Sequence, residues 1–147
     1  DWELAAGQLG HVVASHPEAF ADKSRFSMDW YYPVLTGALT GDAAKSRLAE
    51  QWDTFVMPDR GVRCVSDEPW VTASETAECS LAYSAIGDFY TAQYLLNTTI
   101  QHRTVDGSYL TGLVYPNKVV FPADERSAYT GAAIILAADS LGPKMVT

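Results

Sequence analysis

Three segments of the chain combine helical spacing with an almost complete lack of charge, and this feature constrains the fold more than any other. The segment from Trp30 to Thr40 contains no charged residue, and the segment from Thr72 to Gly87 contains no Lys or Arg. A third helical segment, from about Glu125 to Leu141, is uncharged between Ser127 and Ala138. A helix that is apolar on every side is surrounded by other protein. The pattern therefore predicts three inner helices.

Three further helical segments are more polar, and we expect them to form an outer layer. They cover residues 2–16, a segment opened by Asp42 and ended by Pro58, and residues of about 88–102. Short loops join the second helix to the third and the fourth to the fifth, which is typical of antiparallel helical hairpins. Residues 107–120 can form a small β-hairpin. The sequence thus predicts an all-α fold of helical hairpins, with one small β-hairpin in a loop, over a single domain 1–147.

Composition excludes several classes of function. The 147 residues carry 10 Lys and Arg against 18 Asp and Glu, a net charge of -8, which disfavours binding to nucleic acid. No apolar run reaches the roughly 18 residues of a membrane span. The three histidines form no close ligand pair, so we expect neither a metal nor a cofactor. With two cysteines and no signal peptide, a cytoplasmic location is expected.

Three stretches resemble a known family: MDWYYPVLTGAL, GVRCVSDEPWVTASETAE and DGSYLTGLVYPNKVVFPADERSAYTGAAIILAADSLG. They are similar to actinobacterial proteins described as prenyltransferase-like or toroid-like. This resemblance implies an α/α-toroid, the fold of terpenoid cyclases, protein prenyltransferases and six-hairpin glycosidases, with the chain matching a C-terminal half. The acid, diphosphate and zinc motifs of the cyclases and prenyltransferases are absent.

The toroid resemblance also implies a partner. Three hairpins make half of a six-hairpin ring, and an open half would expose its uncharged inner helices to water. We therefore expect either a homo-oligomer or a missing N-terminal half to cover that face.

The same resemblance implies that a ligand binds where the inner helices begin. The catalytic candidates there are the acids Asp29, Glu75 and Glu78. The ligand-binding candidates are aromatic or cationic: Trp30, Tyr32, Arg63, Trp70, Tyr109, Tyr115 and Tyr129. Paired carboxylates with aromatic rings suit the hydrolysis of a glycosidic bond. An acid among aromatic faces also suits carbocation chemistry.

Each acid has a structural alternative. The sequence from Thr72 to Glu75 matches a capping box, in which Glu75 would bind the backbone of Thr72. Asp29 follows the expected N-cap Ser27 and complements a helix dipole. Glu78 has no cation at helical spacing and is less easily explained. Of the two cysteines, Cys64 in a loop is the candidate for a reactive thiol.

Three functions follow from these observations, and the sequence leaves open whether the protein is an enzyme. The first is a terpenoid-cyclase-like or prenyltransferase-like protein that binds or transforms an isoprenoid or a similarly apolar small molecule. The second is a carbohydrate-active, six-hairpin glycosidase that pairs Asp29 with Glu75 or Glu78. The third is a non-catalytic binding or assembly module.

Overall fold

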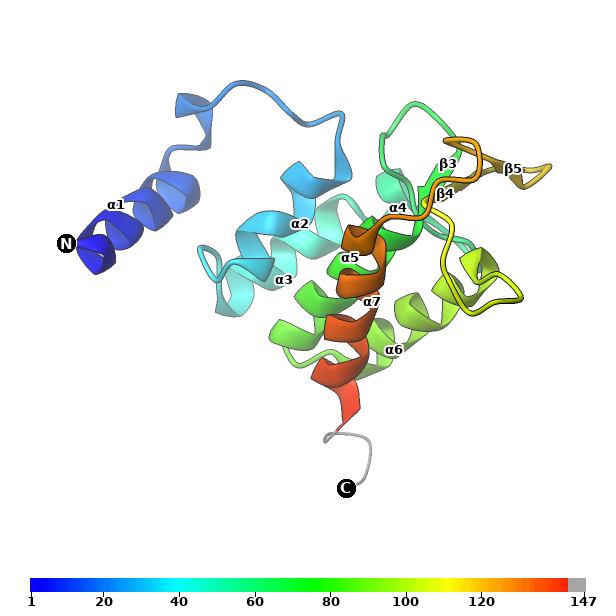
Figure 1. Cartoon of the computed structure of the whole chain (residues 1–147). Helices are drawn as coiled ribbons and strands as arrows, with labels where there is room; N and C mark the ends of the chain where they lie inside the picture. Colours follow the sequence, from blue (N-terminus) through cyan, green and yellow to red (C-terminus); the bar gives the residue numbers. More distant parts are fainter. Residues whose placement is uncertain (143–147) are drawn as a thin grey trace.

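The computed structural model describes residues 1–142, which fold into helices and short strands joined by loops (Figure 1). The helices are α1 (Trp2–Ser15), η1 (Pro17–Ala19), α2 (Ser27–Leu35), α3 (Gly41–Glu50), α4 (Trp52–Phe55), α5 (Ala73–Ala85), α6 (Phe89–Thr98), η2 (Thr99–His102) and α7 (Ala128–Leu141). The strands are β1 (Val56–Met57), β2 (Gly61–Val62), β3 (Trp70–Thr72), β4 (Gly112–Val114) and β5 (Val119–Val120).

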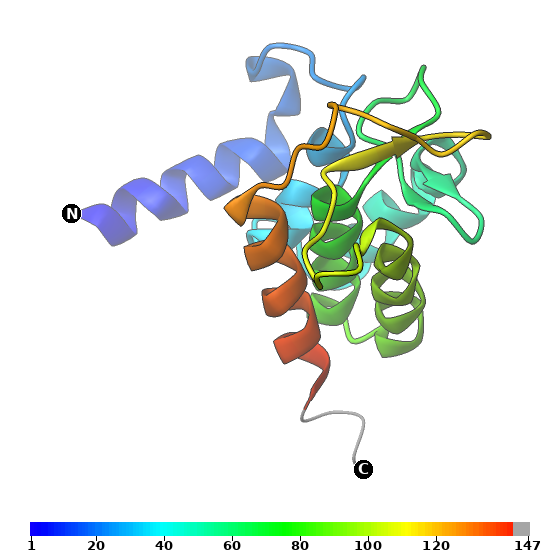
Figure 2. The ribbon, with the colours of Figure 1, turned by 45° about the vertical axis from the view of Figure 1, so that its right-hand side comes forward.

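Helix α5 lies at the centre of the molecule and packs against α2, α6 and α7. Figure 2 shows α7, α5 and α6 side by side. The buried face of α5 carries small side chains, including Ala77, Cys79 and Ala82, so neighbouring helices can approach closely. Ala133 and Ala137 of α7 pack in one cluster with Ala77. The segment from Thr72 to Gly87, which has no Lys or Arg, is therefore buried, as its composition predicts.

Aromatic side chains form the core between α2 and its neighbours. Trp30 and Tyr31 are fully buried, and the Trp30 ring stacks on Phe55 with 5.6 Å between the ring centroids. On α3, the buried residues are Ala44 and Leu48, which lie on the apolar face that the sequence predicts. The expected hairpin of the second and third helices thus forms as α2 and α3.

Two antiparallel sheets show that the all-α prediction is wrong. β1 pairs with β2, and β3, β4 and β5 form a second sheet in that order. The β4–β5 pair falls within residues 107–120, where the sequence predicts a hairpin. Strand β3 pairs with β4 from far along the chain, placing Thr72 opposite Gly112. Alternation of apolar and polar residues over two or three positions is too short to identify such strands from the sequence. The fold is a small mixed domain of helices and sheets.

The half-toroid prediction is also wrong. The helices gather around α5 instead of tracing part of a ring, and the helical hairpins do not repeat, since α2 spans 9 residues and α7 spans 14. The long connections before α5 and α7 fold into sheets. The alternation of apolar and polar helices indicates which helices are buried. It does not distinguish a toroid from a small mixed domain, which also places apolar helices inside and polar helices outside.

Two helices differ from their predicted burial. Helix α7 buries one side on α5 but leaves Ile135 and Leu136 exposed, so it is not surrounded by protein within residues 1–142. Helix α1 buries no residue and projects from the body (Figures 1 and 2). Within residues 1–142 we find no helix with the length and apolar character that a membrane span requires.

Candidate active site

The carboxylate of Glu78 is the meeting point of three helices. Its Oε2 atom accepts a hydrogen bond of 2.6 Å from the hydroxyl of Tyr31, and Oε1 accepts hydrogen bonds from Tyr129 and, at 3.5 Å, from Tyr32. The hydroxyls of Tyr32 and Tyr129 are themselves 3.2 Å apart. Tyr31 and Tyr32 come from the middle of α2, Tyr129 from the first turn of α7, and Glu78 from the N-terminal half of α5. We call this group the Glu78 cluster: Glu78, Tyr31, Tyr32 and Tyr129.

Burial and charge keep the phenols of the cluster protonated. Burial, followed by the nearby Glu78 carboxylate, raises the pKa of Tyr31 far above its ordinary value of 10.0. Burial and the hydrogen bond to Glu78 also raise the pKa of Tyr129. The hydroxyls therefore remain donors throughout the neutral range, and donors directed at a carboxylate stabilise negative charge on it. Glu78 retains 8% exposure, while Tyr129 is 48% exposed at the edge of the cluster.

Glu75 lies one helical turn before Glu78 and is also buried. Its carboxylate accepts a hydrogen bond of 2.6 Å from the hydroxyl of Ser74 and one of 3.5 Å from the thiol of Cys64. The capping box is wrong, because Thr72 makes no side-chain cap and Glu75 binds these other partners. Burial and the Glu75 carboxylate raise the pKa of Cys64 to about 12. A thiol in this state is a poor nucleophile, contrary to the reactivity that the loop position suggests.

Asp29 forms an ion pair with Arg47, whose Nη2 lies 3.3 Å from the Asp29 carboxylate. The reason for the pairing is Pro33, which lies inside α2 and has no N–H to donate to the carbonyl four residues earlier. That carbonyl belongs to Asp29, and Arg47 donates to it at 3.0 Å. The guanidinium also donates to the carbonyl of Trp30 at 3.3 Å. Arg47 thus closes the gap that the proline leaves and fixes the carboxylate beside it.

A groove of about 1160 Å³ lies between the α1–η1 segment and the α2–α3 hairpin. Asp29, Arg47 and Tyr32 line it together with apolar side chains. Tyr32 belongs both to this groove and to the Glu78 cluster. Tyr32 is therefore the residue that the groove and the cluster share.

The remaining ligand-binding candidates do not join the Glu78 cluster. Trp30 is buried in the core, and its indole donates to the carbonyl of Arg47 at 2.9 Å. The other four lie in or near the sheet that contains β3, β4 and β5: Arg63, Trp70, Tyr109 and Tyr115.

Each of these four has partners within the protein. Arg63 donates to the carbonyl of Ser66, and the Trp70 indole donates to the carbonyl of Phe121. The hydroxyl of Tyr115 donates to Gln101 at 3.0 Å, while Tyr109 pairs with Arg103 through the backbone.

Sequence reasoning missed two residues that build the site. Tyr31 donates to the Oε2 atom of Glu78 at 2.6 Å, but the sequence indicates it only as one of several aromatic residues near the helix starts. Arg47 lies in the polar segment that opens at Asp42, where the sequence predicts no site residue. A proline inside an apolar helix was the available signal, since it requires a donor for a free carbonyl, but the sequence does not identify which donor supplies it.

Comparison with known proteins identifies a glycosidase as a relative. No family model matches the chain. A curated protein of Mycolicibacterium hassiacum, named MMP endo-(1,4)-3-O-methyl-alpha-D-mannosidase, is 54% identical to this chain over 141 residues. The alignment covers 96% of the chain, and the chain spans 39% of the length of that relative. The chain is therefore similar to part of a carbohydrate-active enzyme.

This relative overturns the terpenoid prediction. Its name is that of a glycosidase, so the prenyltransferase-like and terpenoid-cyclase-like interpretations and the isoprenoid ligand are wrong. The homo-oligomer prediction is also wrong. It was made only because the chain was taken for half of a ring, and residues 1–142 do not have that architecture.

Proposed function

We propose that this chain is part of a glycoside hydrolase, and that it cleaves 1,4-linked chains of 3-O-methyl-α-D-mannose. The observation that carries the proposal is the buried carboxylate of Glu78, which three tyrosine hydroxyls contact at the meeting point of three helices. The similarity to the mannosidase supplies the substrate class.

Hydrolysis of a glycosidic bond needs two carboxyl groups. One protonates the leaving oxygen as the bond from that oxygen to the anomeric carbon breaks, and the other assists the attack on that carbon. Glu78 takes the second role, because the phenol donors around it stabilise the negative charge that this role requires. Asp29 is the other carboxyl group in this proposal, since its side chain lines the groove beside Tyr32. To protonate the leaving oxygen it first takes up a proton from solvent and gives up its ion pair with Arg47.

Several groups lie where they can hold the sugar. Tyr32 and Tyr129 are both partly exposed and flank the Glu78 carboxylate, so a sugar ring at the cluster would contact their rings. Arg47 holds Asp29 in place through three contacts to α2. Glu75 is buried one helical turn before Glu78 and does not line the groove.

The experiment is the release of reducing ends from a 1,4-linked oligosaccharide of 3-O-methyl-α-D-mannose by the intact protein and its variants. Glu78→Gln keeps the shape of the side chain but removes its charge, so we expect kcat to fall at least about 100-fold. Asp29→Asn should lower kcat by a similar factor. The matched control is Glu68→Gln, which alters an exposed carboxylate of a loop and should leave kcat unchanged.

Cooperative unfolding of each variant separates loss of chemistry from loss of structure. A folded Glu78→Gln protein that retains wild-type kcat would refute the role of Glu78. Absence of hydrolysis in the wild-type protein on this substrate would refute the proposed function itself.

A further inference from the structure

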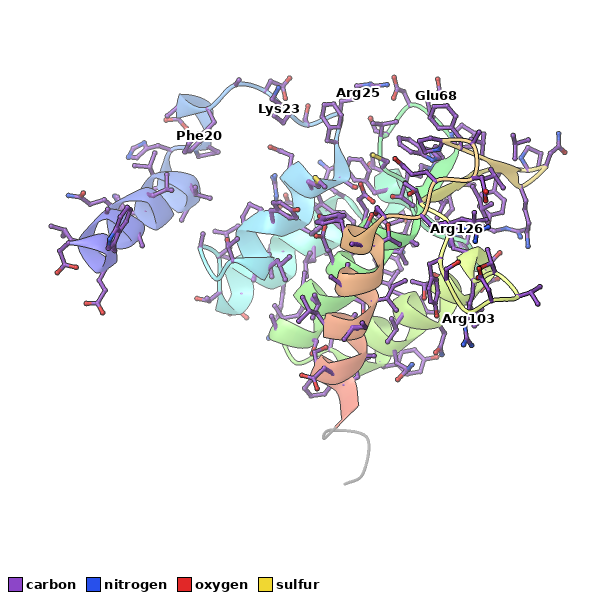
Figure 3. All side chains as sticks on the ribbon, in the orientation of Figure 1. Phe20, Lys23, Arg25, Glu68, Arg103 and Arg126 are labelled. Atoms are coloured by element: carbon purple, nitrogen blue, oxygen red, sulfur yellow. The ribbon has the colours of Figure 1, made fainter. Side chains whose placement is uncertain are left out.

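The groove beside the Glu78 cluster has an unusual wall for a carbohydrate site. Its apolar lining comes from Val13, Pro17 and Phe20 on the α1–η1 side and from Met28 and Leu39 on the α2–α3 side. Polar and charged residues also line it, and they include Glu18, Asp22, Lys23, Ser46 and Glu50. Figure 3 shows Phe20 on the segment that links α1 to α2. Its side chain is 46% exposed, so it is available to a ligand. Unmodified sugars present hydroxyl groups, and those that face the apolar side chains of this wall find no partner there.

The floor of the groove is polar and is held rigidly. Asp29 and Arg47 form their ion pair there, and Arg47 is fixed by the carbonyls of α2. Tyr32 joins the groove to Glu78. A saccharide chain lying in the groove would thus meet an ion pair, apolar side chains and Tyr32, the residue that the groove shares with the Glu78 cluster.

We infer that this groove is a specificity site that selects saccharide units bearing methyl ethers over unmethylated ones. The inference rests on the proposed function for its ligand class. The apolar side chains receive the methyl groups, and the Asp29–Arg47 pair hydrogen-bonds the hydroxyls that remain. The volume of about 1160 Å³ exceeds the roughly 300–1,000 Å³ of typical small-molecule sites, so the groove accommodates more than one sugar ring.

Burial of apolar surface sets the size of the preference. Each methyl group that moves from water into an apolar site contributes about 0.8 kcal/mol, which corresponds to about a fourfold gain in affinity. Two or three buried methyl groups therefore give a preference of roughly 15-fold to 60-fold for the methylated chain. Phe20 provides a large exposed apolar surface on one wall, so its removal should eliminate a substantial part of this preference.

The test is calorimetric binding of two oligosaccharides of equal length by the intact Glu78→Gln protein. One is the 1,4-linked 3-O-methyl-α-D-mannose oligomer, and the other is its unmethylated counterpart. Phe20→Ala shortens a groove side chain, and Tyr90→Ala is the matched control, because Tyr90 is an 88% exposed aromatic residue of α6 outside the groove. Sulfur-linked analogues, which resist hydrolysis, allow the same comparison with the wild-type Glu78.

We expect the methylated oligomer to bind at least tenfold more tightly, with Phe20→Ala reducing that preference severalfold and Tyr90→Ala leaving it unchanged. Equal binding of both oligomers, binding of neither, or a Phe20→Ala variant with full preference would overturn the inference. Failure of the proposed function gives a different result, namely selective binding without hydrolysis by the wild-type protein. Hydrolysis without methyl selectivity would refute the groove assignment alone.

Discussion

The contact between Tyr31 and Glu78 allows the cluster to be tested through stability alone. Tyr31→Phe removes only the hydroxyl that lies 2.6 Å from the Oε2 atom of Glu78. Because Tyr31 is fully buried, water cannot readily replace the lost donor. Among the described residues Tyr31 is the donor to Oε2, whereas Oε1 has two tyrosine partners. The substitution therefore leaves a buried carboxylate oxygen without its hydrogen bond.

The magnitude follows from the kind of bond that is lost. A hydrogen bond to a charged group contributes about 1.5–3 kcal/mol, so we expect the free energy of unfolding to fall by that amount. Tyr32→Phe is the matched control, because its hydroxyl lies 3.5 Å from Oε1 and Tyr129 remains bound to the same atom. We expect Tyr32→Phe to cost less than about 1 kcal/mol.

Equilibrium unfolding in urea, followed by tryptophan fluorescence, measures both values with the slope m as a check on two-state behaviour. A double-mutant cycle with Glu78→Gln adds a second test, since Tyr31→Phe should cost at least about 1 kcal/mol less once the charged acceptor is gone. Equal costs for Tyr31→Phe and Tyr32→Phe, together with a coupling energy near zero, would refute the reasoning.

Three other predictions follow from the same structure. Because the native pKa of Tyr31 is raised, the unfolded chain releases this proton near pH 10 while the native protein retains it, so stability falls above that pH. Tyr31→Phe should make this fall shallower by up to about 1.4 kcal/mol per pH unit in urea titrations, and identical slopes would contradict the raised pKa. Gly112→Ala should destabilise the protein by about 1–3 kcal/mol, because the added carbon meets the Trp70 indole. Gly131 lies in α7 with open space around it, so Gly131→Ala should instead stabilise the protein by about 0.5–1 kcal/mol. Thermal melts compare the two variants, and a higher melting temperature for Gly112→Ala than for Gly131→Ala would be inconsistent with the packing. Cys64, with a pKa of about 12, should resist iodoacetamide at pH 8 in the native protein and react on unfolding, whereas rapid native labelling would contradict its burial beside Glu75.

Local patterns in the sequence predicted much of the secondary structure. The segment after Thr72, which has no Lys or Arg, forms the buried helix α5, and the segment after Asp42 forms α3, which buries Ala44 and Leu48. The residues between 107 and 120 form the β4–β5 pair. Each of these predictions depends on spacing over a few residues, which a single chain records directly.

The overall architecture depended on long-range contacts that spacing does not encode. Strand β3 finds its partner β4 about 40 residues later, so β3 and its pairing with the predicted hairpin were not recognisable from sequence. The exposed side of α7 was also unpredictable, because an apolar composition does not show which side has a neighbour. The resemblance to toroid proteins then led us to predict that the helices form half of a ring, an arrangement that residues 1–142 do not have.

The candidate site was predictable in part. The lack of a cation near Glu78 suggested an unusual role, and the structure places Tyr32 and Tyr129 on its carboxylate. The pairing of Asp29 with Arg47 spans 18 residues and depends on the carbonyl that Pro33 leaves free, so sequence spacing could not identify it.

The most direct test of the account is a crystal structure of the intact Glu78→Gln protein bound to the 1,4-linked 3-O-methyl-α-D-mannose oligomer. The account predicts that the chain lies along the groove past Tyr32. It also predicts a glycosidic bond beside residue 78, with the anomeric carbon or its attacking water within about 3–3.5 Å of that side chain. A saccharide bound elsewhere on the molecule, with the Glu78 cluster closed and out of contact, would contradict the central claim.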